Sequence, residues 1–349
     1  MTHPHAPPES TPSDAAFVRT FLTSFLFLVL LVAGLTILVD PLGRFGTGLI
    51  PPVVSNDRDQ KATLYRSATP RPRIVVLGSS RSKTIAPACL QRLTGRSAFN
   101  FAVNGAGSED FLAILRFLRA QPGDSVQALF IGVDPETMQG TGGVTRALTG
   151  SHLLAPYLPT HQVAEGGVTL GADLLGWQAV SAALRSLGSL GPRRPVSEVV
   201  LEPDGLQRYL KAEAELRTGT FPTAERVIGS IPGVLTRYEA FPALDSIRVS
   251  MLRQFVVEAK AAGLSVTAFI PPVHPALSRA AINTAWAPRT EETVALLRTL
   301  AQDGGIRYVE TRALTVDSMQ FVDAVHFLAP VADRVAEALT GTPGGCALQ

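Results

Sequence analysis

The 349-residue sequence is poor in cysteine, in lysine and in charge overall. Its two cysteines, Cys89 and Cys346, are too few for a disulfide-rich scaffold or a zinc site built from cysteine. Charged residues make up 17% of the chain, the formal net charge is +2, and basic residues do not cluster beyond Arg193 and Arg194. This balance excludes the basic surface of a nucleic-acid-binding protein. Glycines at 140–143 and 166–167 lack the spacing of a phosphate-binding loop.

One long hydrophobic segment stands near the N-terminus. Residues 20–39 carry no charge and match the length of about 20 residues that a helix needs to cross the hydrocarbon core. Because the segment ends without small residues at a cleavage site, we predict an uncleaved signal anchor behind a short tail of residues 1–19. Arg19 favours a cytoplasmic tail. The expected location is a bacterial inner membrane, spanned once, with the globular part in the periplasm.

The rest of the sequence alternates short apolar runs with helical patterns. Continuous apolar runs are typical of parallel strands buried on both faces, and they lie at 74–77, 99–103, 126–133, 264–270 and 306–309. Helical patterns lie at 108–119, 244–262, 291–302 and 329–339. The alternation predicts a three-layer α/β/α domain with a parallel sheet.

Domain boundaries follow from composition. Residues 40–72 are interpreted as a linker, in which the charged run 57–61 is a solvated segment. The domain itself is placed at 73–342 and is followed by a tail at 343–349. Residues 136–240 are too long for a connection and are predicted to form a helical insertion or cap.

One polar motif follows the first predicted strand, and a second precedes the last predicted helix. Gly78-Ser79-Ser80 comes after the first strand, where a tight turn would expose a serine hydroxyl, although serines at such turns also simply cap helices. Asp323 precedes His326 by three residues, so the carboxylate can orient one imidazole nitrogen while the other takes a proton from Ser80. Ligands of open parallel sheets bind beyond the carboxyl ends of the strands, so we expect these motifs to meet there.

Together these motifs resemble the SGNH (GDSL-type) hydrolase superfamily over residues 74–340 without the insertion. The Gly-Ser-Ser-Arg form is similar to the membrane-anchored envelope branch of that superfamily. The resemblance implies a five-stranded, flavodoxin-like sheet, with Ser80 as the nucleophile, His326 as the base and Asp323 as the acid that orients it. It also implies an oxyanion hole formed by the backbone N–H groups of Ser80 and Gly105.

One block departs from the family pattern. The family has Gly-x-Asn-Asp after the third strand, where the asparagine donates to the oxyanion, but this chain has Asp134 at the strand end and no asparagine. An ionised Asp134 cannot donate a hydrogen bond, so either Asn104 supplies the donor or Asp134 stays protonated. Losing one such donor costs about 100–1,000-fold in rate. A non-catalytic scaffold or binding protein in an envelope polysaccharide assembly therefore stays open as the alternative.

Other polar and aromatic residues carry weaker expectations. Arg81 is expected either to bind a carboxylate or phosphate of the substrate or to pair with a structural acid such as Asp134. Asp134 is itself a candidate for substrate binding. His274 either lines the cleft and binds substrate or is an ordinary loop histidine. For Trp177 and Trp286 burial is the expected state, and stacking on sugar rings is the alternative.

The sequence thus predicts a membrane-anchored serine esterase or O-acyltransferase that acts on acyl esters of cell-envelope or exported polysaccharide through an acyl-serine intermediate. The expected partners are the acyl-ester or glycan substrate, the inner membrane through residues 20–39 and, from the resemblance, a membrane-bound acyltransferase. No cofactor and no nucleic acid is expected. No metal is expected either, because His152 and His161 have no carboxylate at metal-ligand spacing.

Overall fold

The computed structural model describes eight stretches of the chain: 14–40, 57–140, 144–158, 175–188, 199–222, 224–239, 241–314 and 321–346. The chain divides into two compact units. The smaller comprises Met1–Ser55 with Gly167–Arg194, and the larger comprises Asn56–Gly166 with Pro195–Gln349. The predicted insertion therefore contributes to both units. The predicted tail and linker lie partly outside the described residues.

The larger unit is built on a five-stranded parallel sheet in the order β2-β1-β3-β6-β7. The strands are β1 (Ile74–Gly78), β2 (Ala98–Asn100), β3 (Ala128–Gly132), β6 (Ser265–Phe269) and β7 (Arg307–Val309). This is the flavodoxin-like order, so the predicted fold class is confirmed. Beyond β2, the N–H groups of Phe101 and Val103 still donate to the carbonyls of Val76 and Gly78, which extends the pairing to the predicted end of that strand.

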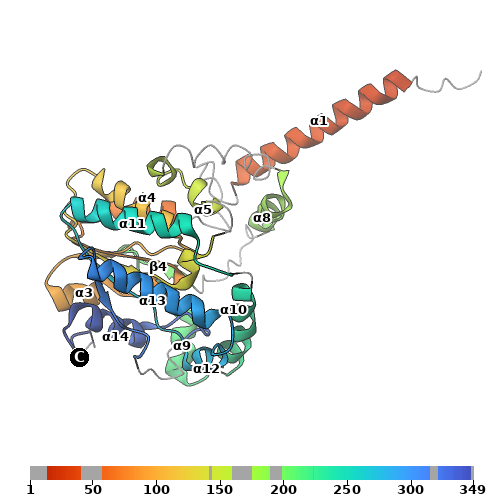
Figure 1. The fold of residues 1–349 in the computed structure, drawn as a ribbon. Helices are drawn as coiled ribbons and strands as arrows, with labels where there is room; N and C mark the ends of the chain where they lie inside the picture. The colour runs from red at the N-terminus through yellow and green to blue at the C-terminus, as the bar shows by residue number, and fades with distance from the viewer. Residues whose placement is uncertain are drawn as a thin grey trace, which may run out of the picture. The chain divides into compact units, whose positions relative to one another are not determined.

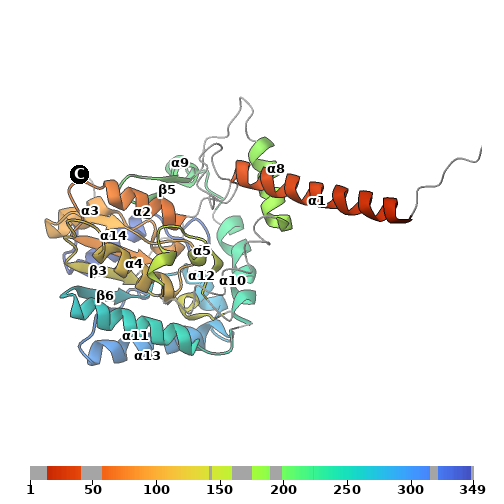
Figure 2. The same ribbon diagram turned by 90° about the horizontal axis from the view of Figure 1, so that it is seen from above.

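Helices cover both faces of the sheet (Figures 1 and 2). Residues of β1 alternate between two cores: Val75 and Leu77 point into one, and Ile74 and Val76 into the other. The first core is closed by α2 (Asp57–Ser67), α4 (Ser108–Arg119), α11 (Ser246–Ala261) and α13 (Trp286–Gln302). The second is closed by α3 (Pro87–Thr94) and α14 (Ala329–Thr340). Burial on both faces explains why the strands read as unbroken apolar runs.

The charged run that begins at Asp57 is not a solvated part of a linker, and this expectation was wrong. The run opens helix α2, where Arg58 is 1% and Lys61 is 0% exposed. Arg58 donates two hydrogen bonds to the Asp110 carboxylate at 2.7 and 2.9 Å, and Lys61 Nζ donates to the Asn100 carbonyl at 3.0 Å. Arg58 stays charged because it is paired with a carboxylate, whereas burial lowers the pKa of Lys61 well below its ordinary value.

The described parts of the insertion combine short helices with a β-hairpin. In the larger unit they are η2 (Pro135–Met138), α5 (Arg146–Thr149), η3 (Ala155–Tyr157), β4 (Val199–Leu201), β5 (Gln207–Tyr209), α9 (Leu210–Thr218), η5 (Ala224–Ile228) and α10 (Gly229–Glu239). The antiparallel β4–β5 hairpin packs beside the β2 end of the sheet, where Gln207 N–H donates to the Lys83 carbonyl and Asn100 N–H donates to the Asp204 carbonyl. The insertion is thus more than the helical cap that was predicted.

The smaller unit consists of two described helices, α1 (Asp14–Val39) and α8 (Trp177–Gly188), which pack against each other. Within the described residues, α1 is the one helix long and apolar enough to span a membrane, over Ala15–Val39. Its 25 residues extend about 37 Å, and the hydrocarbon core is about 30 Å thick. The predicted segment 20–39 lies within this helix.

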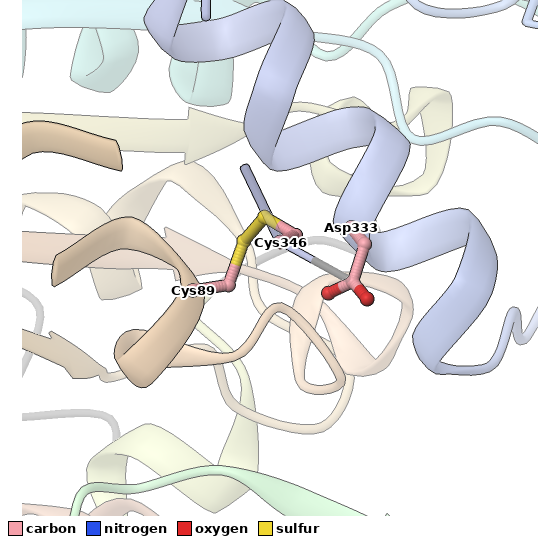
Figure 3. Close-up of side chains that lie close together, drawn as sticks. All are labelled: Cys89, Asp333 and Cys346. Carbon is pink, nitrogen blue, oxygen red and sulfur yellow. A yellow bond between two sulfur atoms is a disulfide. The ribbon is translucent and has the colours of Figure 1, made fainter. Parts of the chain in front are cut away.

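A disulfide joins Cys89 of α3 to Cys346, near the C-terminus, across 257 residues of sequence (Figure 3). The Arg92 guanidinium donates to the Cys346 carbonyl at 2.6 Å and reinforces the attachment. Possible ligand atoms of Asp333 and the two cysteines all lie within 4.8 Å of one another. Metal binding by cysteine needs the thiolate, so the bonded sulfurs do not offer a metal site in this oxidised form.

Candidate active site

The turn after β1 presents Ser80 at the carboxyl edge of the sheet. Ser79 caps the short helix η1 (Ser80–Ser82) by accepting a hydrogen bond from the Arg81 backbone. The turn is tight because a Cβ on Gly78, or on Gly132 of the neighbouring strand, would clash with the buried Ser82 side chain. Ser80 itself is half-buried.

The loop that carries Asp323 and His326 is closed by its own backbone. Phe321 and Phe327 form an antiparallel bridge and are fully buried. Between them, Asp323 Oδ1 accepts hydrogen bonds from the backbone N–H groups of Val325 at 2.9 Å and His326 at 2.8 Å. These bonds fix the carboxylate on the same side of the loop as the imidazole.

The structure brings Ser80, His326 and Asp323 into one hydrogen-bonded chain. His326 Nε2 lies 2.8 Å from Ser80 Oγ, and His326 Nδ1 lies 2.7 Å from Asp323 Oδ2. The side chains of His326 and Asp323 are 25% and 31% exposed, so the site is sheltered but open to solvent. Burial alone would raise the pKa of Asp323, but the hydrogen bonds and charge of His326 hold it below its ordinary value. Asp323 is therefore an ionised acceptor that fixes the orientation of the ring.

Segments from outside the motifs hold this loop in place. The Ala324 N–H donates to Ser230 Oγ of α10 at 2.9 Å, and the Ala324 carbonyl accepts from His274 N–H at 2.9 Å. Thr84 Oγ1, just after the Ser80 turn, donates to the Phe327 carbonyl at 3.0 Å. The last contact ties the two halves of the site directly to each other.

The backbone N–H groups of Ser80 and Gly105 have no acceptor within the described part of the chain. Gly105 has a φ of +56°, in the region that favours glycine, and lies in an exposed turn after β2. These are the two groups expected to form an oxyanion hole. Their unsatisfied state suits groups that receive a ligand.

Asn104, next to Gly105, is held by a buried ion pair. Asp57 Oδ2 accepts from Lys83 Nζ at 2.9 Å and from Asn104 N–H at 2.7 Å, and Lys83 Nζ also donates to Asn104 Oδ1 at 3.0 Å. We call this arrangement the Asp57–Lys83 clamp. Burial raises the pKa of Asp57, but the charges of Lys83 and Arg58 hold it below its ordinary value. Because Lys83 engages Oδ1, the amide nitrogen of the exposed Asn104 is the end left for other acceptors.

Asp134 is buried beside the serine turn. Its Oδ2 accepts a 2.5 Å hydrogen bond from Ser79 Oγ, and it is 1% exposed. Burial raises the pKa of Asp134 to about 6, against the opposing effect of the Arg81 charge. The carboxyl is thus poised to be ionised at neutral pH and protonated in mild acid.

Arg81 pairs with an acid, which was one of the two alternatives predicted for it. It is 4% exposed and forms an ion pair with Glu136 in η2, while Asp134 acts on it at longer range. The buried Tyr238 of α10 lies against the same pair, and the negative charge of Glu136 adds to burial in raising the tyrosine pKa well above its usual range. Arg81 is thereby built into the wall of the site.

His274 is not placed to bind substrate. It is 5% exposed, and its Nδ1 accepts from the Ala276 N–H at 3.1 Å to cap helix α12 (Pro275–Ala280). Its ring packs edge-to-face on Phe321 with centroids 5.4 Å apart. The histidine supports the loop of the site. Of the two tryptophans, Trp286 is half-buried, but Trp177 is 80% exposed, so burial was the wrong expectation there.

Sequence reasoning missed several residues that position the site: Asp57, Lys83, Glu136, Ser230 and Tyr238. One signal was present for Lys83, because the chain has only four lysines and one of them stands three residues after Ser80. The other four are brought in from α2, η2 and α10 by contacts that no local pattern encodes.

Comparison with known proteins adds little to this picture. No protein-family profile matches the chain, and no curated protein matches it significantly. Among solved structures, the chain is similar to a Bacteroides fragilis protein whose assignment as an acylhydrolase is itself provisional. The identity is 12%, the TM-score is 0.36, and the match covers 81% of this chain and 92% of the other. A likeness this low carries no information about activity, so the chemistry must follow from the residues themselves.

Proposed function

We propose that this protein is a membrane-anchored serine hydrolase or O-acyltransferase of the SGNH-like class. The observation that carries the proposal is the chain of hydrogen bonds from Ser80 Oγ to His326 Nε2 and from His326 Nδ1 to Asp323 Oδ2, at 2.8 and 2.7 Å. A hydroxyl, an imidazole and a carboxylate in this order are what a serine nucleophile needs for activation at neutral pH.

The proposed reaction begins when Ser80 Oγ attacks the carbonyl carbon of an acyl ester and His326 Nε2 takes the hydroxyl proton. Asp323 stabilises the imidazolium through the Nδ1–H bond. The ester C–O bond then breaks, and His326 returns the proton to the departing alcohol, which leaves an acyl-serine. Water releases the acyl group in a hydrolase, whereas a glycan hydroxyl accepts it in a transferase. In either case His326 takes the proton of the nucleophile and gives it to Ser80 Oγ as the bond between the acyl group and Ser80 breaks.

The oxyanion of the tetrahedral intermediate needs hydrogen-bond donors. The N–H groups of Ser80 and Gly105 are our candidates, because neither has an acceptor in the described part of the chain. We assign the third donor to the Asn104 amide nitrogen, which the Asp57–Lys83 clamp leaves pointing away from Lys83. Asp134, buried and hydrogen-bonded to Ser79, contributes a negative charge nearby at neutral pH.

Two features support a location outside the cytoplasm. Helix α1 has the length and composition of a membrane anchor, and the Cys89–Cys346 disulfide suits an oxidising compartment such as the periplasm. An anchored enzyme on that side meets acyl esters of cell-envelope or exported polysaccharide, which we propose as the substrate class. A membrane-bound acyltransferase that delivers acyl groups is the proposed partner.

A fluorophosphonate probe tests the enzymatic proposal directly, because it reacts with activated serine hydroxyls. The full chain in detergent should be labelled, and labelling should be lost in Ser80→Ala and in His326→Ala. Ser79→Ala is a matched control that removes the neighbouring hydroxyl and leaves Ser80 and His326 in place, and it should retain labelling. Absence of labelling in folded wild-type protein, or equal labelling of Ser80→Ala, would overturn the proposal.

The second candidate function is a non-catalytic scaffold or binding protein of an envelope polysaccharide assembly. Asp134 favours it, because a buried carboxylate beside the serine turn opposes the development of negative charge on a substrate oxygen. Folded protein that binds acylated glycan without any reaction of Ser80 would support this candidate over the enzyme.

A further inference from the structure

Helix α8 of the smaller unit is apolar on two opposite faces. Ala182, Ala183 and Ser186 are buried and share one face by their spacing along the helix. The opposite face is exposed and carries Trp177, Leu184 and Leu187, with exposed fractions of 80%, 55% and 37%. Exposed clusters of large apolar side chains mark surfaces that are covered in the working state of a protein.

Helix α8 has the apolar helix α1 as its neighbour in the smaller unit. Helices α1 and α8 pack against each other, and both views place α8 beside the C-terminal end of α1 (Figures 1 and 2). Side chains of α1 become buried at that end, where Thr36 is 1% and Val39 is 2% exposed, whereas Phe17 and Phe21 at the other end are more than half exposed. Helix α8 therefore lies where α1 reaches the surface of the hydrocarbon core.

We propose that α8 is an interfacial membrane helix whose exposed face of Trp177, Leu184 and Leu187 inserts into the bilayer leaflet through which α1 emerges. That face and the exposed surface of α1 are both apolar, and the two helices pack against each other. Its 12 residues extend about 18 Å, too short to span about 30 Å of hydrocarbon but suited to lying along its boundary. Tryptophan is enriched at this depth. The inference rests on the membrane anchoring in the proposed function and not on its chemistry.

The tryptophans of the chain provide the experiment. The sequence contains only Trp177 and Trp286, so the full-length Trp286→Phe variant carries a single fluorophore on α8. We would reconstitute it into vesicles of phosphatidylcholine and phosphatidylglycerol whose acyl chains carry bromine, a contact quencher, near the glycerol end or near the methyl end. The expected result is a blue-shifted emission in unbrominated vesicles and strong quenching, strongest with bromine near the glycerol end.

The matched control is full-length Trp177→Phe, in which the remaining fluorophore is Trp286, at the start of α13 in the larger unit. Its emission should be quenched little by either lipid. Leu184→Asp in the Trp286→Phe background should weaken the quenching of Trp177, because a carboxylate on the same face opposes insertion.

Several results would overturn the inference. The first is that bromolipids do not quench Trp177, as expected if its face stacks on sugar or binds a protein. The second is that bromine near the methyl end quenches Trp177 most strongly. The third is that Trp286 is quenched as strongly as Trp177. Flotation of the vesicles separates these results from a failure of anchoring. Protein that floats with vesicles while Trp177 stays unquenched contradicts the inference alone, whereas protein that does not float contradicts the proposed anchor.

Discussion

Replacing Asp134 by asparagine exchanges a buried, titratable carboxyl for a neutral amide of the same shape. In the folded protein its pKa is about 6, against an ordinary value of 3.8, because burial disfavours the charged form. The folded state therefore holds the proton between these two pH values while the unfolded chain has released it. The stability that this group contributes is fully present below about pH 4 and is lost as the pH rises through about 6.

The difference between the two pKa values corresponds to about 3 kcal/mol of unfolding free energy. Asp134→Asn should match the wild type at pH 4 and exceed its stability at pH 7.5 by up to this amount. The gain is an upper limit, because the substitution also removes one negative neighbour of Arg81 and alters the hydrogen bond from Ser79. An amide that no longer repels the oxyanion should also speed fluorophosphonate labelling of Ser80 at pH 7.5, by about 10-fold or more.

The assay is urea unfolding of the full chain in detergent, for both proteins, at pH 4, 6 and 7.5. Other groups with altered pKa values, such as Glu109 and Asp333, are common to both proteins and cancel in the difference. Asp134→Glu is a matched control that retains the charge and should gain no stability at pH 7.5. A stability difference that is the same at pH 4 and pH 7.5, or one in favour of the wild type at pH 7.5, would refute the reasoning.

Three further predictions test the supports of the site. Asp323→Asn removes the carboxylate that fixes the His326 ring, so fluorophosphonate labelling of Ser80 should slow by about 1,000-fold or more while the midpoint of thermal unfolding changes little. An unchanged labelling rate would contradict the role given to Asp323. Lys83→Met removes the nearer of the two cations paired with the buried Asp57 carboxylate and leaves Arg58 at 3.6 Å, so unfolding should become easier by up to about 3–5 kcal/mol. Adding Asp57→Asn should restore much of this stability but not the labelling rate, and joint recovery would show that the clamp does not position Asn104. Cys346→Ser removes the disulfide and should lower the free energy of unfolding by about 2–4 kcal/mol without loss of Ser80 labelling. The measurement is unfolding of this variant and of the wild type with and without a thiol reductant, and a reductant that changes the stability of both proteins equally would contradict the prediction.

The sheet could be predicted because its strands are encoded locally. In β1 all five residues are buried, and they alternate between two apolar cores, so each position must be hydrophobic or small. The Ser80 turn and the Asp323–His326 loop could be predicted for a related reason. Parallel strands present their carboxyl ends at one edge, which brings motifs 246 residues apart in sequence to the same place.

Helix α2 shows where local patterns fail. Asp57, Arg58 and Lys61 carry the composition of a solvated segment, yet in the folded protein they bind Lys83, Asp110 and the Asn100 carbonyl, which lie 26 to 52 residues away. A buried charge costs little only when its partner is in place, and the partner is a property of the fold. The predictions for His274 and Trp177 were limited in the same way. Whether a histidine caps a helix, or a tryptophan lies on an exposed helix face, depends on what packs beside it.

The residues that prediction missed support the site and are not members of the Ser80–His326–Asp323 series of hydrogen bonds. That series needs three side chains whose chemical types are dictated by proton transfer, so these types can be recognised in the sequence. The supports need only a donor or an acceptor at the right point, and many residue types meet that need. Ser230 could as well be threonine for the bond that it accepts from Ala324, and the sequence around it gives no sign of the contact. If this is correct, Ser230→Thr should keep the labelling rate of Ser80, whereas Ser230→Val should reduce it, because the Ala324 N–H would lose its acceptor and free the loop that carries His326.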